Sequence, residues 1–322
     1  PGAPDDPQAT KDGGGGSDTD GGGGNDASAG GQDGGNNVAG PTVDRSDPKL
    51  HEFGLNPKEL DPTVKDHVSV QYAQLDTRAT PIGRLVVFLP GYTNPPGAWR
   101  DHGRKLAEFG FHVMVPYYNN DWPSSACNGM GSSCNTDTRW EALVGEDTSG
   151  AVNVARADSA EGRVVTMLKH LRTAHPGGDW GYYLDGSDNL RYGRVIIAGI
   201  SHGASSAGLY ATRRPFARVV MHSGGAAGDS KDPMTPLSEW YGLSHTGDGQ
   251  HAAHLSAWSN SKMLGSPTSI DGKTPPYGSA HQLITSEASS YPHCSVAVHS
   301  SSPPENTDTY IFEPAWRYMY AN

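Results

Sequence analysis

One stretch of this 322-residue chain restricts its fold more than any other: RVIIAGISHGASSAGLYA, residues 194–211. It opens with an apolar run typical of a buried strand and closes with small residues typical of a helix packed closely on a sheet. Ser201 lies between the two, on a turn tight enough to strain its backbone. Gly199 and Gly203 flank it at positions where a Cβ would clash. We therefore expect Ser201 to project above a sheet, with the positive end of a helix directed at it.

Short apolar runs alternate with helical patterns through the rest of the chain. Strand patterns occupy residues 67–75, 84–90, 111–118, 194–200, 218–223, 239–245 and 281–287. Helical patterns occupy residues 97–109, 202–213, 251–264 and 313–320, and another begins at Asp158, with Glu161 as its capping partner, and ends at His175 and Pro176. Residues 119–155 and 225–238 are rich in Gly, Ser, Asn and Asp, which predicts loops. This alternation predicts an α/β fold with a mostly parallel central sheet and helices on both faces.

The start of the chain differs in composition from the rest. Residues 1–40 hold 14 glycines and almost no large apolar side chain. Such a segment cannot bury enough surface to become ordered, so we expect a disordered Gly/Asp-rich tether over residues 1–45 and one folded domain over residues 46–322. Eight aspartates in the first 46 residues supply much of the net charge of −11. The folded part lacks a Lys/Arg run, so we expect no nucleic-acid partner.

Targeting and redox signals indicate a protein that works outside the cytoplasm. The chain opens with PGAPDD rather than Met, as in a product whose targeting segment has been removed, and no apolar run is long enough to cross a bilayer. Cys127 and Cys134 enclose the loop CNGMGSSC, where we expect a disulfide, the alternative being two unpaired thiols. Cys294 is expected to be a buried thiol that only packs. These features predict a secreted or cell-surface monomer without a transmembrane segment.

The G-I-S-H-G motif, preceded by a strand and followed by a small-residue helix, resembles the nucleophile elbow of the α/β-hydrolase superfamily, of the secreted serine esterase or lipase type. The resemblance extends from about residue 65 to the end of the chain. It implies an α/β-hydrolase catalytic domain with Ser201 as nucleophile after the fifth strand. The backbone N–H groups of Tyr92, in FLPGYTNPPGAW, and of His202 would form the oxyanion hole. The His202 side chain is interpreted as a wall of the pocket.

The family order places the general base after both the serine and the acid in the chain. His293 follows the last strand pattern, on a loop expected at the carboxyl edge of the sheet, and is our first choice. His299 and His281 remain alternatives, although His281 opens a strand and would lie at the opposite edge. The base would accept the proton of Ser201.

The acid is expected just past a strand between the serine and the histidine. Asp248, at the end of EWYGLSHTGDG, is our first choice, with Asp229 and Asp232 as alternatives. Asp248 could also be no more than a turn residue, because Thr-Gly-Asp-Gly suits a turn. As the acid, it would fix the tautomer of His293 and stabilise the imidazolium.

Two other classes of function compete with this interpretation. A metal-dependent hydrolase could use the crowded group His245, Asp248, His251 and His254, but no Glu stands between the last two as a metalloprotease base would. A non-catalytic binding module on the same fold is the second alternative. We expect no metal and no other cofactor.

The substrate is less constrained than the reaction. Only 46 residues separate Ser201 from Asp248, which leaves little room for a lid domain. We expect an open cleft lined by Tyr92, Trp99, Trp122 and Trp240. Such a cleft suits carboxylic esters of small molecules, lipids, polyesters or other bulky groups outside the cell.

Overall fold

The computed structural model describes residues 40–228 and 232–321, so most of the predicted tether lies outside the described residues, as does Asp229. The strands are β1 (Leu50–Leu55), β2 (Gln71–Asp76), β3 (Leu85–Leu89), β4 (His112–Val115), β5 (Val195–Ile200), β6 (Arg218–His222), β7 (Trp240–His245), β8 (Thr268–Ser269) and β9 (Gln282–Thr285). The helices are α1 (Pro57–Leu60), α2 (Arg100–Glu108), α3 (Cys134–Val144), α4 (Ala160–Ala174), α5 (His202–Arg213), α6 (His251–Asn260), α7 (Pro292–Ser295) and α8 (Glu313–Ala321), with short 3₁₀ helices between some of them.

All the strands belong to one sheet with the order β1-β2-β4-β3-β5-β6-β7-β9-β8. The pairs β1–β2 and β2–β4 are antiparallel, and every other neighbouring pair is parallel. The carboxyl ends of β3 to β9 therefore meet at one edge of the sheet. In open parallel sheets, binding sites form at this edge.

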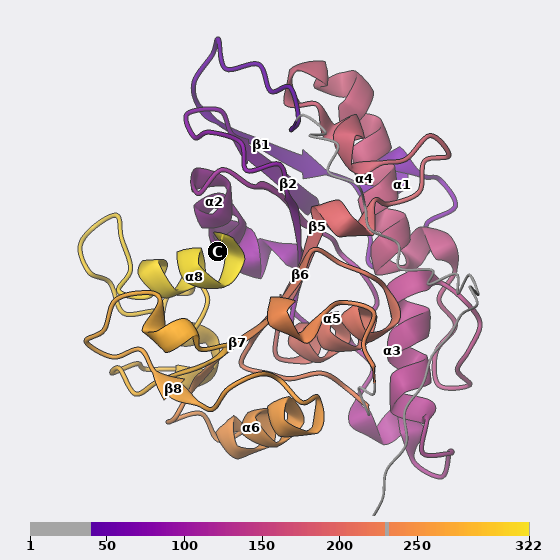
Figure 1. The fold of residues 1–322 in the computed structure, drawn as a ribbon. Coiled ribbons are helices and arrows are strands. Elements are labelled where there is room, and N and C mark those ends of the chain that lie inside the picture. The colour runs from indigo at the N-terminus through magenta and orange to yellow at the C-terminus, as the bar shows by residue number, and fades with distance from the viewer. Residues whose placement is uncertain (1–39, 229–231, 322) are drawn as a thin grey trace, which may run out of the picture. The chain divides into compact units, whose positions relative to one another are not determined.

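Helices cover both faces of the sheet. Successive side chains of a buried strand point to opposite faces, so each central strand contributes to a core on either side. On β3, Val87 belongs to a core that includes Leu143 of α3 and Leu168 of α4. The next residue, Phe88, belongs to a second core that includes Leu106 of α2 and residues of α8. Figure 1 shows α3, α4 and α5 on one side of the sheet and α2 and α8 on the other. The prediction of a mostly parallel α/β sheet covered on both faces is confirmed.

The predicted loop over residues 119–155 is wrong in its middle, because α3 lies there. Most of α3 is buried on all sides, including the charged Arg139 and Glu141, so no apolar stripe marks it in the sequence. The carboxylate of Glu141 accepts hydrogen bonds from the backbone N–H groups of Ser149 (2.9 Å) and Val154 (2.8 Å). These bonds fasten the following loop against the helix.

The start of α4 also differs from the prediction by one residue. Ser159, not Asp158, caps the helix, since its hydroxyl accepts a hydrogen bond from the N–H of Gly162 at 3.2 Å. Asp158 instead pairs with the buried guanidinium of Arg163 at 2.8 Å. The helix ends before His175, as predicted.

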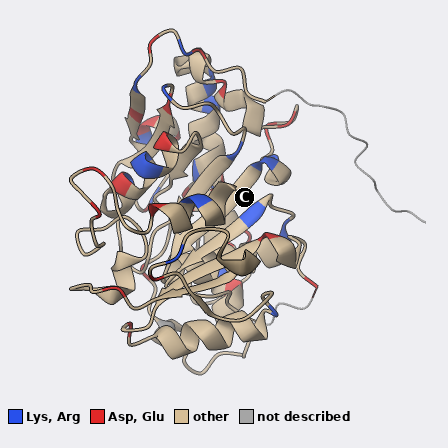
Figure 2. Ribbon diagram, turned by 60° about the vertical axis from the view of Figure 1, so that its left-hand side comes forward, with Lys and Arg blue, Asp and Glu red and all other residues tan. Residues whose placement is uncertain are grey.

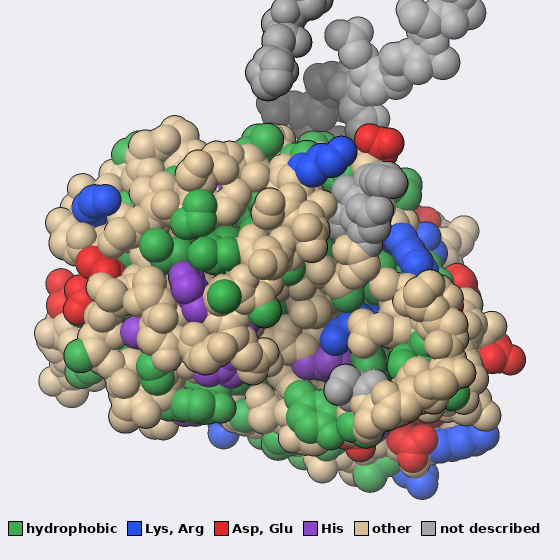
Figure 3. Space-filling view, turned by 90° about the horizontal axis from the view of Figure 1, so that it is seen from below, with side chains coloured by type: hydrophobic (Ala, Val, Ile, Leu, Met, Phe, Trp, Pro, Cys, Tyr) green, Lys and Arg blue, Asp and Glu red, His purple; other side chains and the backbone are tan. Residues whose placement is uncertain are grey.

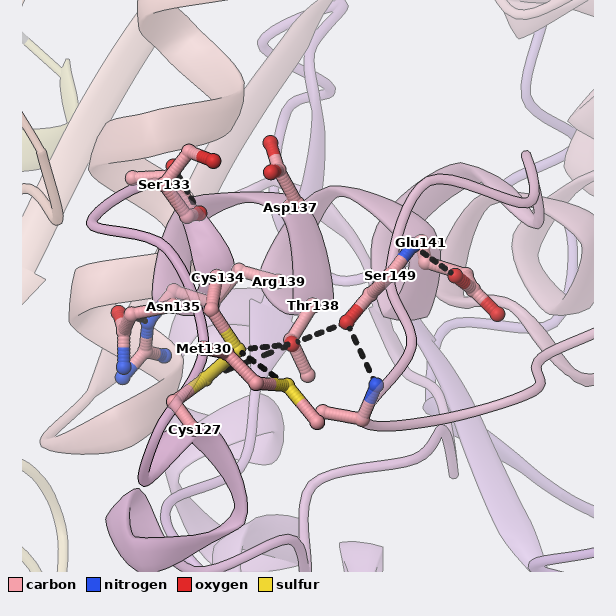
Figure 4. The surroundings of a disulfide bond; sticks show 12 residues. Cys127, Met130, Ser133, Cys134, Asn135, Asp137, Thr138, Arg139, Glu141 and Ser149 are labelled. Carbon is pink, nitrogen blue, oxygen red and sulfur yellow. Dashed lines mark hydrogen bonds between the residues drawn. A yellow bond between two sulfur atoms is a disulfide. The ribbon is translucent and has the colours of Figure 1, made fainter.

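The predicted disulfide between Cys127 and Cys134 is present, with the two Cα atoms 5.7 Å apart (Figure 4). It ties the preceding loop to the first residue of α3. One turn further on, the hydroxyl of Thr138 lies 2.6 Å from that of Ser149. Cys294 is free and buried, as predicted, and burial raises the pKa of its thiol to about 11.

Charged residues of both signs are interspersed over the ribbon (Figure 2). Glu52 of β1 is an example: its burial alone would raise its pKa, but hydrogen bonds from Arg100 and Arg104 lower that pKa to about 2. Within residues 40–228 and 232–321, no helix has the length and apolar character needed to cross a membrane.

Candidate active site

Ser201 lies at the carboxyl edge of the sheet, between the end of β5 and the first residue of α5. Its backbone has φ 55° and ψ −118°, a region that a residue with a side chain rarely occupies. The turn is fixed from below, because the Ser201 N–H donates to the carbonyl oxygen of His222 at 2.9 Å. The half-buried side chain is thereby held above the sheet, at the N-terminus of α5.

The glycines on either side of Ser201 allow this turn. A Cβ on Gly199 would lie 2.5 Å from the carbonyl carbon of Gly203, and a Cβ on Gly203 would lie 2.0 Å from the carbonyl oxygen of Leu89. Both obstacles are backbone atoms, which cannot rotate away as a side chain can. The predicted need for glycine at these two positions is confirmed.

Two backbone N–H groups predicted to bind the oxyanion, those of Tyr92 and His202, donate to no acceptor among the described residues. The Tyr92 N–H donates to no acceptor among the described residues, and His202 opens α5, where a helix leaves its N–H groups without intrahelical acceptors. The loop of Tyr92 lies against the serine, since a Cβ on Gly91 would be 3.5 Å from Ser201 Cβ. Asn120 holds this loop by donating to the carbonyl oxygen of Gly91 at 2.7 Å.

His293 and Asp248 form a hydrogen-bonded pair. His293 is in α7, which follows β9, and Asp248 lies in the turn between β7 and α6. The Nδ1 atom of His293 is 2.7 Å from a carboxylate oxygen of Asp248. Its Nε2 atom bonds to no described residue and is not enclosed, so it can exchange a proton with a group in the site.

Opposing effects act on Asp248, whose exposed fraction is only 8%. Burial raises its pKa, but the hydrogen bonds from the N–H of Gln250 (2.9 Å) and from His293 lower it, and the net result lies below the ordinary value. Asp248 is therefore ionised at neutral pH. An ionised carboxylate on Nδ1 leaves Nε2 of His293 as the proton acceptor.

The structure joins His293 to Asp248 but not to Ser201, whose hydroxyl makes no hydrogen bond within the described residues. Two adjacent glycines, Gly224 and Gly225, lie between the backbone of Ser201 and that of His254. A Cβ on Gly224 would lie 2.9 Å from the carbonyl oxygen of Ser201, and one on Gly225 would lie 3.4 Å from that of His254. The ring centroids of His254 and His293 are 6.1 Å apart. Nucleophile–base hydrogen bonds are often long without substrate.

The alternative residues lie elsewhere or are otherwise engaged. His281 is at the amino end of β9, and its Nδ1 lies 3.0 Å from the carbonyl oxygen of Trp240. His299 bonds to the hydroxyl of Ser301 at 2.8 Å and has no carboxylate partner within the described ranges. Asp232 is exposed, in the loop before β7.

The crowded histidines at and after the end of β7 do not assemble as the metal alternative requires. His245 is occupied by the carbonyl oxygen of Glu287, at 2.6 Å, and His251 bonds to the hydroxyl of Ser244. Among the described residues, the one group of three with ligand atoms close enough for a metal ion is Asp248, His254 and His293. A metal there would occupy the same His293 and Asp248 that form the pair.

Two of the tryptophans expected in an open cleft are instead in the core. Trp99 is 1% exposed, and Trp240, which opens β7 at the opposite edge of the sheet, is 0% exposed. Both predictions are wrong because large aromatic side chains bury most surface where two layers meet. Tyr92 is exposed, and Trp122 packs edge-on against His202 with ring centroids 4.7 Å apart.

The His202 imidazole lies between Trp122 and Tyr92, as a wall residue would. Burial, reinforced by the charge of Arg139, lowers its pKa to about 2, so the ring is neutral. The sequence interpretation missed Arg139, which lies in the segment predicted as a loop. One feature of the sequence could have indicated it: no acidic residue lies three or four positions from Arg139, although helical arginines often pair with an acid at that spacing.

Comparisons with known proteins give little further information. No protein-family model and no curated protein matches the sequence. Among solved structures, a phospholipase/carboxylesterase from Dyadobacter fermentans DSM 18053 is 15% identical with a TM-score of 0.38, over 84% of this chain and 94% of that one. A proposed dienelactone hydrolase from Klebsiella pneumoniae subsp. pneumoniae MGH 78578 is 14% identical with a TM-score of 0.37, over 84% and 91%. At these values the chemistry is inferred from the site's own geometry.

Proposed function

We propose that this chain is a serine hydrolase of the α/β-hydrolase superfamily that cleaves carboxylic esters. The observation that carries the proposal is the backbone of Ser201, held at φ 55° between β5 and α5. Strain of this kind persists where the surrounding structure enforces it, and it clusters at functional sites. The strand order supports the proposal, since Ser201, Asp248 and His293 follow β5, β7 and β9 at one edge of the sheet.

In the proposed reaction, Ser201 Oγ attacks the ester carbonyl carbon while its proton moves to Nε2 of His293. Asp248 stabilises the imidazolium through the Nδ1 hydrogen bond. The N–H groups of Tyr92 and His202 bind the oxyanion of the tetrahedral intermediate. His293 then returns the proton to the leaving alcohol, and a water molecule activated by His293 hydrolyses the acyl-enzyme.

The cellular location, the oligomeric state and the substrate class are also part of the proposal. The disulfide Cys127–Cys134 supports an extracytoplasmic location, because such bonds persist in oxidising compartments. We infer a monomer that acts on small-molecule or polymeric esters, including lipids and polyesters. The proposed acyl transfer needs no cofactor.

One specific observation favours a second candidate, a metal-dependent hydrolase. Asp248, His254 and His293 could together hold an ion. Burial, as the largest effect, lowers the pKa of His254 to about 4, so its imidazole is neutral and able to bind a metal. In this candidate Ser201 would have no essential role.

Hydrolysis of 4-nitrophenyl acetate tests the proposal. We expect turnover by the wild type and losses in kcat/KM of at least about 1,000-fold in Ser201→Ala and His293→Ala, while His281→Ala keeps wild-type activity. Treatment with EDTA should change nothing. Full activity in Ser201→Ala together with loss in EDTA would establish the metal candidate, and a folded but inert wild type would favour a binding module.

A further inference from the structure

Arg139 of α3 is a buried cation that contacts the residue after the candidate nucleophile. It is 8% exposed, and its Nη1 donates to the carbonyl oxygen of His202 (2.9 Å) and to the hydroxyl of Ser206 (2.9 Å). Its Nε donates to the side chain of Asn135 at 3.1 Å. All three acceptors are neutral. The first residue after the nucleophile is therefore in direct contact with this positive charge.

No carboxylate balances this charge within the described residues. Arg139 takes part in none of their ion pairs. Its helix carries two acids, Asp137 and Glu141, each two positions away, and Glu141 instead accepts hydrogen bonds from the loop after α3 (Figure 4). Buried charges in proteins are normally paired, because an unpaired one loses its hydration without compensation. Arg139 also has an unused donor. Its Nη2 bonds to no described residue and is not among the enclosed polar atoms.

The neighbours of Arg139 carry further unsatisfied polar atoms. The guanidinium stacks over the ring of Trp122 at 5.0 Å, and Trp122 in turn contacts the ring of His202. The indole Nε1 of Trp122, which is 6% exposed, and both ring nitrogens of His202 are enclosed and have no hydrogen-bond partner among the described residues. Such atoms are uncommon in folded proteins, and an acceptor on a ligand would satisfy the Trp122 donor.

One end of the molecule is hollowed at its surface (Figure 3). Figure 3 views the molecule from the end where α6 and the start of α3 lie in Figure 1. It shows a hollow in which a Lys or Arg side chain lies beside a His, with further histidines on the neighbouring surface. Positive charge thus lies in a concave place on this face of the molecule.

We propose that Arg139 and Trp122, beside His202, form a subsite that binds a carboxylate carried by the ester substrate. The guanidinium Nη2 and the indole Nε1 are donors only, so each suits an oxygen of a carboxylate. This inference rests on the proposed ester hydrolysis and narrows its substrates to esters of dicarboxylic acids or of hydroxy acids. The positive charge contacts the residue after the serine and would hold the acid group of the substrate on that side of the scissile bond.

Matched ester pairs locate the carboxylate on the substrate. Mono-4-nitrophenyl adipate and its methyl ester test an acid on the acyl side, and 4-acetoxybenzoate and 4-acetoxybenzamide test an acid on the alcohol side. We expect the wild type to prefer the charged member of one pair by about 10- to 100-fold in kcat/KM, the range of a hydrogen bond to a charged group. No preference in either pair, with active enzyme, would overturn the subsite and leave the ester hydrolase standing.

Variants assign that preference to Arg139. Arg139→Gln should reduce the charged-to-neutral ratio by about 10- to 100-fold. Arg213→Gln is the matched control, because Arg213 stacks on Trp140 at 4.8 Å as Arg139 does on Trp122, and it should keep the wild-type ratio. An unchanged ratio in folded Arg139→Gln would overturn the proposal.

Calorimetric titration tests the subsite without turnover and without a variant that must fold. Benzoate should bind to the wild-type protein at least about 10-fold more tightly than benzamide. Equal affinities, or no benzoate binding, would overturn the subsite. If every ester is inert but benzoate binds selectively, the proposed hydrolysis fails while the carboxylate site stands.

Discussion

Replacing Gly203 by alanine tests whether the close contact between α5 and β3 positions the nucleophile. The new Cβ would lie 2.0 Å from the carbonyl oxygen of Leu89 and 2.5 Å from that of Pro90. Non-bonded atoms of this kind normally approach to roughly 3.5 Å, so the helix would have to move by about 1 Å or more. Neither obstacle can rotate away, because both belong to the backbone of the segment that leads into the Tyr92 loop.

Two effects of the Gly203→Ala change can be estimated. Forcing a methyl group into a well-packed contact costs about 1–3 kcal/mol in the free energy of unfolding. A displacement of about 1 Å at the first turn of α5 also moves the His202 N–H and Ser201 relative to each other. A misplacement of this size can cost about 100-fold in rate. We therefore expect a less stable protein whose kcat falls by about 100-fold.

The assay combines urea unfolding with hydrolysis of 4-nitrophenyl acetate. Gly186→Ala is the control, because a Cβ at Gly186 meets no atom within 4 Å and should change neither quantity appreciably. If Gly203→Ala matches Gly186→Ala in both stability and kcat, the α5–β3 contact does not position the serine and the reasoning is refuted.

Three further changes give separate predictions. Asp248→Asn should lower kcat for 4-nitrophenyl acetate by about 1,000-fold or more with little change in KM, and a change in KM alone would contradict its role toward His293. The double change Cys127→Ser and Cys134→Ser removes a disulfide that joins residues 7 positions apart. Urea unfolding should show a free energy of unfolding lower by about 2 kcal/mol, and an unchanged value would mean that the disulfide does not stabilise the fold. Burial lowers the pKa of His112 and His222 to about 4. Below pH 6.5, the approximate pKa of histidine in the unfolded chain, the unfolded chain binds protons that the folded chain does not. The free energy of unfolding should therefore fall by up to about 3 kcal/mol per histidine between pH 6.5 and pH 4. A urea midpoint that stays constant over that range would contradict this.

The elements that local sequence determines were predictable. Ser201 could be located because the strand, the flanking glycines and the small-residue helix all lie within one short stretch. His293 and Asp248 were chosen from the chain order that the resemblance implies, and the structure brings them within 2.7 Å. Their role in catalysis stays a prediction.

The parts that depend on long-range packing were not predictable from one sequence. Trp99 and Trp240 resemble cleft residues in composition alone, and only the layers of the fold show that they are buried. Helix α3 lacks an apolar stripe because its polar side chains are also buried. Arg139 was missed for this reason, since its significance comes from its contacts with α5 and Trp122.

Labelling with a serine-directed organophosphate, diethyl 4-nitrophenyl phosphate, tests the central claim most directly. Intact and peptide mass spectrometry should show one diethylphosphoryl group per molecule, on Ser201, with slower labelling in His293→Ala because the base that activates the hydroxyl is missing. Loss of ester hydrolysis should follow the extent of labelling. A folded wild-type protein that hydrolyses esters at the full rate while Ser201 stays unlabelled would contradict the account.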